Sequence, residues 1–199
     1  PLSLVISAFA PVGDIRRTLT PQLCKDRDTR LLLLDLGRGL NRLGGSTCAQ
    51  VFNQLGDECP DVDARALKQL YDAVQELLAG GLLLAYHDRS DGGLFVTLAE
   101  MAFAGGCGVD IELGALGADP IAALFSEEVG VVLQCRSNDL SAARAIFERH
   151  DLAAVAHDIG APTATATVRI SCDGEELLQA PTRALQQTWS ELSYQMQSL

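Results

Sequence analysis

A short segment rich in charged residues and glycine, residues 86–93, carries the strongest chemical signal in the sequence. Its polar members crowd into five positions directly before two glycines: His87, Asp88, Arg89, Ser90 and Asp91, then Gly92 and Gly93. Carboxylate oxygens are the ligands that Mg²⁺ prefers. The amides at a helix N-terminus accept anions, and glycine lets a phosphate approach the backbone closely. The segment therefore fits a site for magnesium and a phosphate group.

The same segment also permits a structural interpretation. Ser90 or Asp91 would cap the helix that begins at the glycines, and Asp88 would favour the dipole of that helix. Only the ligand interpretation requires Asp88 and Ser90 to face a bound molecule.

Two other segments have residue types that suit anion or metal binding. Residues 43–47, L-G-G-S-T, precede a helix and would form either a phosphate-binding nest or a tight turn with Ser46 as the N-cap. The turn is the expected structure. Glu127 and Glu128 enter a strand and would bind a substrate or a metal. Adjacent carboxylates are more often part of a solvated loop, which is what we expect here.

Composition and missing motifs exclude several classes of function. The chain has 15 Lys and Arg against 26 Asp and Glu, a net charge of −11 and a pI near 4.6. This balance argues against a polyanion-binding or anionic membrane surface. No G-x-x-x-x-G-K-[ST] motif occurs, and Arg42 stands at the third glycine position of the G-x-G-x-x-G pattern that begins at Gly37. The binding of a single nucleotide remains compatible with this acidic composition, because a metal ion can supply the positive charge.

The cysteines do not indicate a metal site. The six Cys form no C-x-x-C pair, and no Cys/His cluster has zinc spacing. Several lie in apolar patterns, so we expect reduced, mostly buried thiols of a cytoplasmic protein. Cys107 has small neighbours, but it leaves a helix and enters a strand, the reverse of a nucleophile elbow.

Periodicity predicts the elements that must position these residues. We expect a helix over residues 64–79, capped by Asp63, because its apolar residues recur every three or four positions. A turn at Asp173-Gly174 predicts a hairpin. The remaining expected strands are 2–9, 31–36, 82–86, 108–113, 129–135 and 153–159. The remaining expected helices are 47–55, 94–104, 120–125, 139–150 and 182–199. This order indicates one layered α/β sandwich around a mixed sheet.

The motifs resemble, in order along the chain, those of a known enzyme family. Residues 87–94, H-D-R-S-D-G-G-L, look like the H-D-x-S-[DE]-G-G motif of phosphoribosylformylglycinamidine synthase. This glutamine- and ATP-dependent enzyme of purine biosynthesis is also called FGAR amidotransferase. Other segments also look like its long, single-chain form: 1–9, 10–12, 18–21, 35–39, 43–46 and 125–128. Together they span nearly the whole chain, which makes the resemblance far more specific than any one motif.

The resemblance implies a place in a larger enzyme. The family's synthetase core is an internal duplication related to aminoimidazole ribonucleotide synthetase, and each half has an N-terminal and a C-terminal subdomain. Residues 1–199 look like the C-terminal subdomain of the second half, with the terminal helix, about residues 182–199, leading toward a glutaminase domain. The implied fold class is α+β, a three-layer α/β/α arrangement with a mixed sheet, like the C-terminal domain of aminoimidazole ribonucleotide synthetase.

The resemblance also implies roles for single residues. Asp88 matches the family's Mg²⁺ ligand, and Ser90 matches its contact with the nucleotide, ATP or ADP. Residues 125–128, F-S-E-E, match the place of an S-x-S-Q-E-type substrate-binding run, with Glu where that run has its Gln. A carboxylate would repel a substrate phosphate, so this departure suggests a nucleotide held for structure rather than for turnover.

The implied function is part of the ligase that converts formylglycinamide ribonucleotide to formylglycinamidine ribonucleotide. No catalytic residue is assigned to this chain, and the isolated chain is expected to be inactive. The expected partners are the other synthetase subdomains and the glutaminase domain of the same parent chain, with no nucleic acid and no membrane. The alternatives are a non-catalytic acidic interaction domain or another ATP-using enzyme of this fold, such as a selenophosphate synthetase, a thiamine-phosphate kinase or a hydrogenase-maturation protein.

Overall fold

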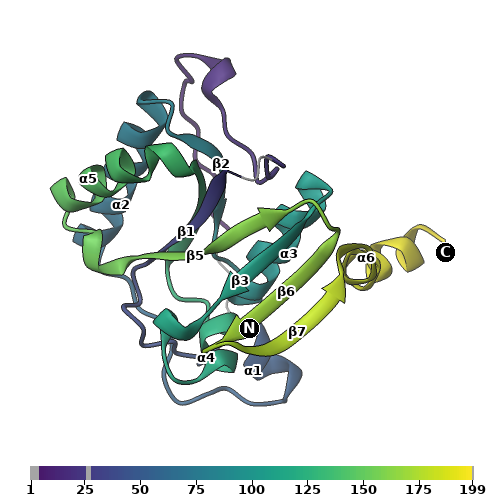
Figure 1. Ribbon diagram of the computed structural model, residues 1–199. Coiled ribbons are helices and arrows are strands. Elements are labelled where there is room, and N and C mark those ends of the chain that lie inside the picture. The colour runs from purple at the N-terminus through teal and green to yellow at the C-terminus, as the bar shows by residue number, and fades with distance from the viewer. Residues whose placement is uncertain (1–4, 26–27, 199) are drawn as a thin grey trace.

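A seven-stranded sheet runs through the computed structural model, which describes residues 5–25 and 28–198 (Figure 1). The strands lie in the order β2-β4-β1-β5-β3-β6-β7. Their bounds are β1 Thr29–Asp35, β2 Leu83–Asp88, β3 Gly108–Glu112, β4 Gly130–Arg136, β5 Ala156–Thr163, β6 Thr167–Cys172 and β7 Glu175–Pro181. Neighbouring strands are antiparallel except β3 and β6, which are parallel. The predicted mixed sheet is confirmed.

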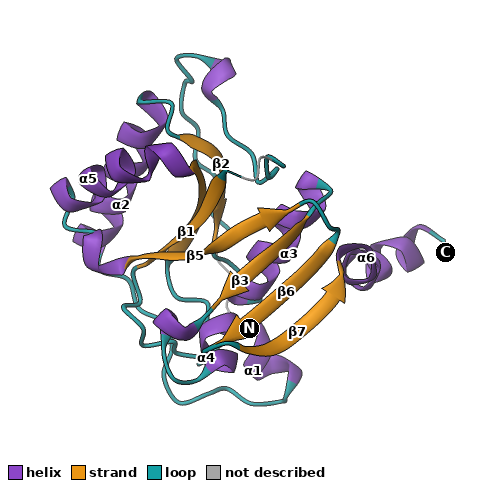
Figure 2. Cartoon of the chain, in the orientation of Figure 1, coloured by secondary structure: helices purple, strands orange, loops and turns teal. Residues whose placement is uncertain are grey.

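Helices pack on both faces of the sheet where β2, β4 and β1 lie (Figure 2). Their bounds are α1 Thr47–Val51, α2 Ala64–Ala79, α3 Gly93–Gly105, α4 Pro120–Phe125, α5 Leu140–Arg149 and α6 Thr182–Gln197. The leucines of β1 alternate between the faces, as side chains of a strand must. Leu31 and Leu33 join the core beneath α3 and α4, whereas Leu32 and Leu34 pack with α2 and α5. The three-layer α/β/α arrangement is therefore confirmed.

Local sequence explains the best-predicted elements. Asp63 caps α2 through Oδ1, which accepts hydrogen bonds from the amides of Arg65 at 2.8 Å and Ala66 at 3.3 Å. The hairpin of β6 and β7 turns at Asp173 and Gly174, whose φ angles of 51° and 81° are those of a type I′ turn. Both predictions are confirmed.

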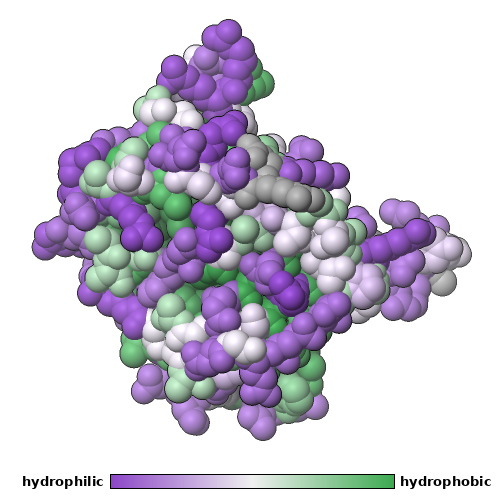
Figure 3. All heavy atoms as spheres, viewed as in Figure 1, coloured by the Kyte–Doolittle hydropathy of each residue, from purple (hydrophilic) through white to green (hydrophobic). Residues whose placement is uncertain are grey.

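The two halves of the sheet differ in what covers them. On β3 and β6, the face away from the α3 core carries an exposed ion pair between Asp110 and Arg169. Figure 3 shows hydrophilic residues over most of this side of the molecule, with smaller hydrophobic areas between them. In the part of the chain that the structure describes, no helix is long and apolar enough to cross a membrane.

The predicted buried strand at residues 2–9 is wrong where it can be compared. Residues 2–4 lie outside the described part of the chain, and residues 5–9 are irregular. Val5 is 89% exposed and Phe9 is 96% exposed. The segment around Thr20, which comes later in the chain, lies at the edge of the sheet beside β2. There the amide of Tyr86 donates a hydrogen bond to the carbonyl of Thr20 at 3.1 Å. An apolar run forms a buried strand only when a sheet edge accepts it.

The expected burial of the cysteines is also wrong for most of them. Cys107 and Cys135 are buried, whereas Cys24 and Cys59 are exposed. Burial raises the pKa of Cys107 and raises that of Cys135 to about 12. Neither buried thiol has the lowered pKa of a nucleophile.

Candidate functional site

Strand β2 ends at Asp88 and presents its carboxylate to solvent. The strand pairs with β4 so that Asp88 lies opposite Val131, at the same end of the sheet as Asp35 on β1. The Asp88 side chain is 65% exposed. Ser90 Oγ donates to Asp88 Oδ2 at 2.6 Å, and this hydrogen bond is the main cause that lowers the pKa of Asp88. The site therefore offers an ionised, accessible carboxylate beside a hydroxyl group.

Helix α3 begins directly after this pair without a side-chain cap. Its N-cap residue is Gly92, which is in the left-handed conformation with φ 82°. Since glycine has no side chain, the N-cap residue makes no side-chain hydrogen bond to the amides of the first turn. Ser90 donates to Asp88 instead, and Asp91 is exposed. The structural alternative, in which Ser90 or Asp91 caps α3, is therefore wrong.

A carboxylate from another segment lies at this helix start. Glu127 Oε1 accepts a hydrogen bond from the amide of Gly92 at 2.8 Å and from the amide of Thr47 at 2.9 Å. The N-termini of α1 and α3 are thus joined by one side chain. The Gly92 amide already has an anionic partner, so a phosphate at Asp88 and Ser90 would not gain this donor.

The segment before α1 is a turn, as expected. Ser46 caps α1, with Oγ accepting from the amide of Ala49 at 3.2 Å. Gly44 has no room for a side chain, since an added Cβ would lie 2.3 Å from the carbonyl oxygen of Glu58. The segment therefore has the expected tight turn with Ser46 as the N-cap.

Glu128 is buried, so the expectation of a solvated loop at Glu127 and Glu128 is wrong. Its carboxylate pairs with Arg42, whose Nε lies 2.7 Å from Oε1 and whose Nη2 lies 2.8 Å from Oε2. The amide of Arg42 also donates to Oε1 at 3.1 Å. The hydrogen bond with Glu128 raises the pKa of Arg42. This two-point contact fixes the loop before α1 against the strand that follows α4.

A second buried ion pair connects the remaining motifs. Arg89 Nη2 donates to Asp35 Oδ1 at 2.5 Å, and Arg89 Nε donates to the carbonyl of Glu128 at 2.6 Å. The Arg89 and Asp35 side chains are 1% and 4% exposed. Asp35 also accepts from the amides of Gly37 at 3.2 Å and Gly39 at 2.7 Å. The Asp35 turn, the Asp88 turn and the Glu127-Glu128 segment therefore form one polar network.

Sequence reasoning assigned no role to Asp35, Arg42 or Arg89. A signal was available for Asp35, because a lone carboxylate ends the otherwise apolar run Leu31–Leu34. A charge in that position needs a buried partner. No local pattern identifies the partner, which lies 54 residues along the chain.

The residues present fit the magnesium ion that the resemblance implies. Among the described residues, no group of three or more His, Cys, Asp and Glu side chains is placed to hold a metal by itself. Mg²⁺ in nucleotide sites is held by one or two carboxylates together with phosphate oxygens and water. Asp88 would supply one such carboxylate, and the other ligands would come from the nucleotide and from outside this chain.

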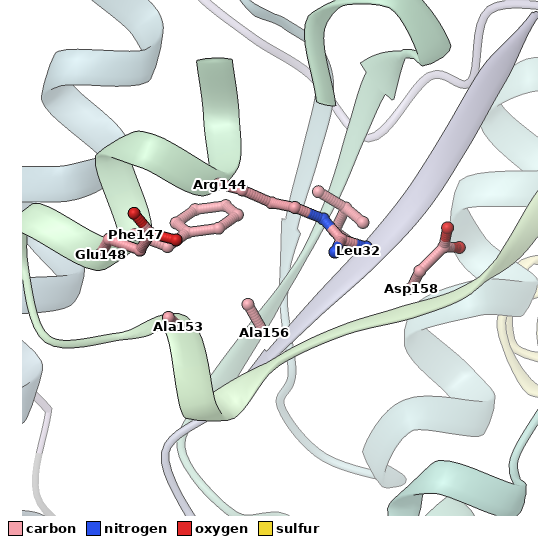
Figure 4. Close-up of a pocket in the computed structure, with 7 residues that line it drawn as sticks. All are labelled: Leu32, Arg144, Phe147, Glu148, Ala153, Ala156 and Asp158. Carbon is pink, nitrogen blue, oxygen red and sulfur yellow. The ribbon is translucent and has the colours of Figure 1, made fainter. Parts of the chain in front are cut away.

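A cavity and a groove border β1 in the described part of the chain. Figure 4 shows a cavity of about 120 Å³ between α5, β1 and β5, which shares no lining residue with the Asp88 turn. It lies on the α2–α5 side, where Leu32 packs. A groove of about 340 Å³ borders Asp35, Arg38 and His157. Neither is lined by Asp88, whose exposed side chain lies at an open surface.

The fold is a mixed sheet with a polar network of buried ion pairs at one end. The chain belongs to the family of AIR synthase related proteins, C-terminal domain, whose family model matches residues 29–173. The predicted resemblance to a C-terminal domain of this kind is confirmed for residues 29–173, and the assignment of residues 1–199 to one subdomain stays a prediction.

Solved structures show the same fold. The chain resembles T. maritima PurL complexed with ATP, with a TM-score of 0.68 and 16% identity, over 86% of this chain and 27% of that chain. It resembles phosphoribosylformylglycinamidine synthase II from Thermotoga maritima, with a TM-score of 0.69 and 15% identity, over 86% and 28% of the two chains. It also resembles E. coli HypE, a hydrogenase maturation protein, with a TM-score of 0.60 and 24% identity, over 82% and 52%.

Proposed function

We propose that this chain supplies the Asp88 and Ser90 side of a Mg-nucleotide site in a cytoplasmic phosphoribosylformylglycinamidine synthase. In this proposal, the remaining synthetase subdomains and the glutaminase domain belong to the same parent chain. The whole enzyme uses ATP and glutamine to convert formylglycinamide ribonucleotide to formylglycinamidine ribonucleotide. Family membership and the order of the motifs along residues 1–128 support this choice.

One observation carries the proposal: the exposed Asp88 carboxylate and the Ser90 hydroxyl are hydrogen-bonded to each other beside a helix start that neither of them caps. In a purely capping role, at least one of the two side chains would accept a hydrogen bond from an amide of the first turn of α3, and neither does. A Mg²⁺ ion, when bound, would neutralise phosphate charge. Asp88 would hold that ion, and the Ser90 hydroxyl would rotate to donate to a phosphate oxygen.

Glu127 supports an auxiliary role for this site rather than turnover. Its carboxylate accepts hydrogen bonds from the amides of Gly92 and Thr47, so these two donors are not free for a phosphate. Phosphoryl transfer depends on positive groups that stabilise charge as it develops. A fixed carboxylate at the helix start works against that requirement, so we propose a nucleotide that is retained for stability.

A second candidate is another ATP-using enzyme of this fold, of the hydrogenase-maturation type. The likeness to E. coli HypE favours it, because identity is 24% and the match covers 52% of that chain, against 27% of T. maritima PurL. The two candidates differ in substrate. Glutamine-dependent turnover of formylglycinamide ribonucleotide by the intact protein would select the first, and its absence would select the second.

The test of the nucleotide site is the melting temperature of the intact protein with and without Mg-ADP. We expect Asp88→Asn to remove most of the stabilisation that Mg-ADP gives, through lost linkage. Ser90→Ala should reduce the stabilisation by Mg-ADP by about one hydrogen bond to a charged group, roughly 1.5–3 kcal/mol. Asp91→Asn is the matched control, because Asp91 is an exposed neighbour. Equal Mg-ADP shifts in all three variants and the parent would contradict the assignment.

A further inference from the structure

A chain of polar contacts runs from the Asp88 turn into the terminal helix. His87 Nε2 lies 2.9 Å from Glu100 Oε2 on α3. The other oxygen of that carboxylate, Oε1, accepts from Trp189 Nε1 on α6 at 2.9 Å. The indole also packs edge-on against Phe103, with ring centroids 6.0 Å apart. Because a carboxylate only accepts and indole only donates, Glu100 is fixed between the two rings.

The other nitrogen of the His87 imidazole, Nδ1, does not share the contact with Glu100. His87 Nδ1 is buried and has no hydrogen-bond partner among the described residues. It lies 3.5 Å from Asp88 Oδ1, whose carboxylate is held on its other oxygen by Ser90. Buried polar atoms without partners are rare in folded proteins, and each calls for an explanation. Here a small rotation of the Asp88 carboxylate would supply the missing partner.

We propose that His87 is a positioning residue for the Asp88 carboxylate, and that Glu100 and Trp189 fix the imidazole in place. In the ligand-bound protein, Nδ1 donates to Asp88 Oδ1, and the contact of Nε2 with Glu100 holds the ring in that orientation. Groups that hydrogen-bond a metal ligand orient it, and their loss typically lowers metal affinity about 10–100-fold. The inference rests on the proposed function of Asp88 and links that residue to α6.

Two substitutions of His87 separate its two contacts. The amide of Asn reaches the position of Nδ1, and the amide of Gln reaches the position of Nε2. His87→Gln therefore keeps the contact with Glu100 and loses the one with Asp88, whereas His87→Asn does the reverse. His157→Gln is the matched control, because His157 is a half-buried histidine of β5 in a different groove.

The first measurement is the affinity of the intact protein for ADP as a function of Mg²⁺ concentration. We expect His87→Gln to lower the Mg²⁺-dependent affinity about 10–100-fold, His87→Asn to lower it less, and His157→Gln to leave it unchanged. A merely structural role would make the two His87 variants equal. Equal affinities of the parent and both His87 variants would overturn the inference and leave the proposed function standing. No Mg²⁺-dependent binding by the parent would overturn both.

The second measurement needs no ligand. Trp189 is the single tryptophan of the chain, so its emission reports the Glu100 contact directly. In the 199-residue chain, we expect His87→Asn to shift the Trp189 emission, and both His87→Gln and His157→Gln to leave it as in the parent. An unshifted spectrum in His87→Asn would overturn the link to α6.

Discussion

Replacing Arg89 by Met removes the cation from a buried ion pair and leaves Asp35 behind. The two side chains are 1% and 4% exposed, and Nη2 lies 2.5 Å from Oδ1. Breaking such a pair by removing one partner costs about 3–5 kcal/mol, because the remaining charge has lost its compensation. The carbonyl of Glu128, now 2.6 Å from Arg89 Nε, also loses a donor. For a chain of this size we expect Tm to fall by roughly 6–20 °C.

The assay is thermal unfolding followed by circular dichroism, with two comparison variants. Arg169→Met breaks the exposed pair with Asp110, whose side chains are 51% and 40% exposed, and should cost only about 0–1 kcal/mol. The double variant Arg89→Met with Asp35→Asn removes the uncompensated charge and should recover part of the loss. An Arg89→Met variant that is no less stable than Arg169→Met would contradict the expected cost of leaving Asp35 unpaired.

Three further outcomes are expected. Gly93→Ala should destabilise the chain by at least 1–3 kcal/mol in thermal unfolding, since φ is +67° and a Cβ would lie 2.7 Å from backbone oxygens around the end of α4. Iodoacetamide should label exposed Cys59 well before Cys135, whose pKa is about 12, as mass spectrometry would show. The hydrogen bond from Ser90 lowers the pKa of Asp88 below 3.8. Mg-ADP binding should therefore persist above this lowered pKa and be lost as the pH falls through it. In Ser90→Ala, binding should be lost at a higher pH than in the parent.

Contacts between close neighbours were predictable from the sequence. The helix of residues 64–79 and its Asp63 cap were correct, because the cap, the apolar spacing and the glycine stop all lie within one segment. The position of Asp88 at a strand end and of Ser90 before a buried helix was correct for the same reason. The roles of these two residues toward a ligand stay predictions.

Contacts between distant segments were not predictable. Glu127 meets Thr47 and Gly92, which lie 80 and 35 residues away along the chain. In the sequence, two adjacent glutamates look solvated, because nothing in their own segment neutralises them. The fold supplies Arg42 to one of them and two helix amides to the other.

The sequence by itself determined most of the elements, their order and the family-like motifs, since these depend on periodicity, capping and local turns. Only the tertiary structure decided which charges are buried and that the N-cap residue of α3 makes no side-chain hydrogen bond. It also decided that residues 5–9 do not pair with the sheet. The physical reason is the cost of burial. An ion pair such as Asp35–Arg89 is stable only when both partners arrive at the same place, and their meeting depends on the packing of the whole sheet.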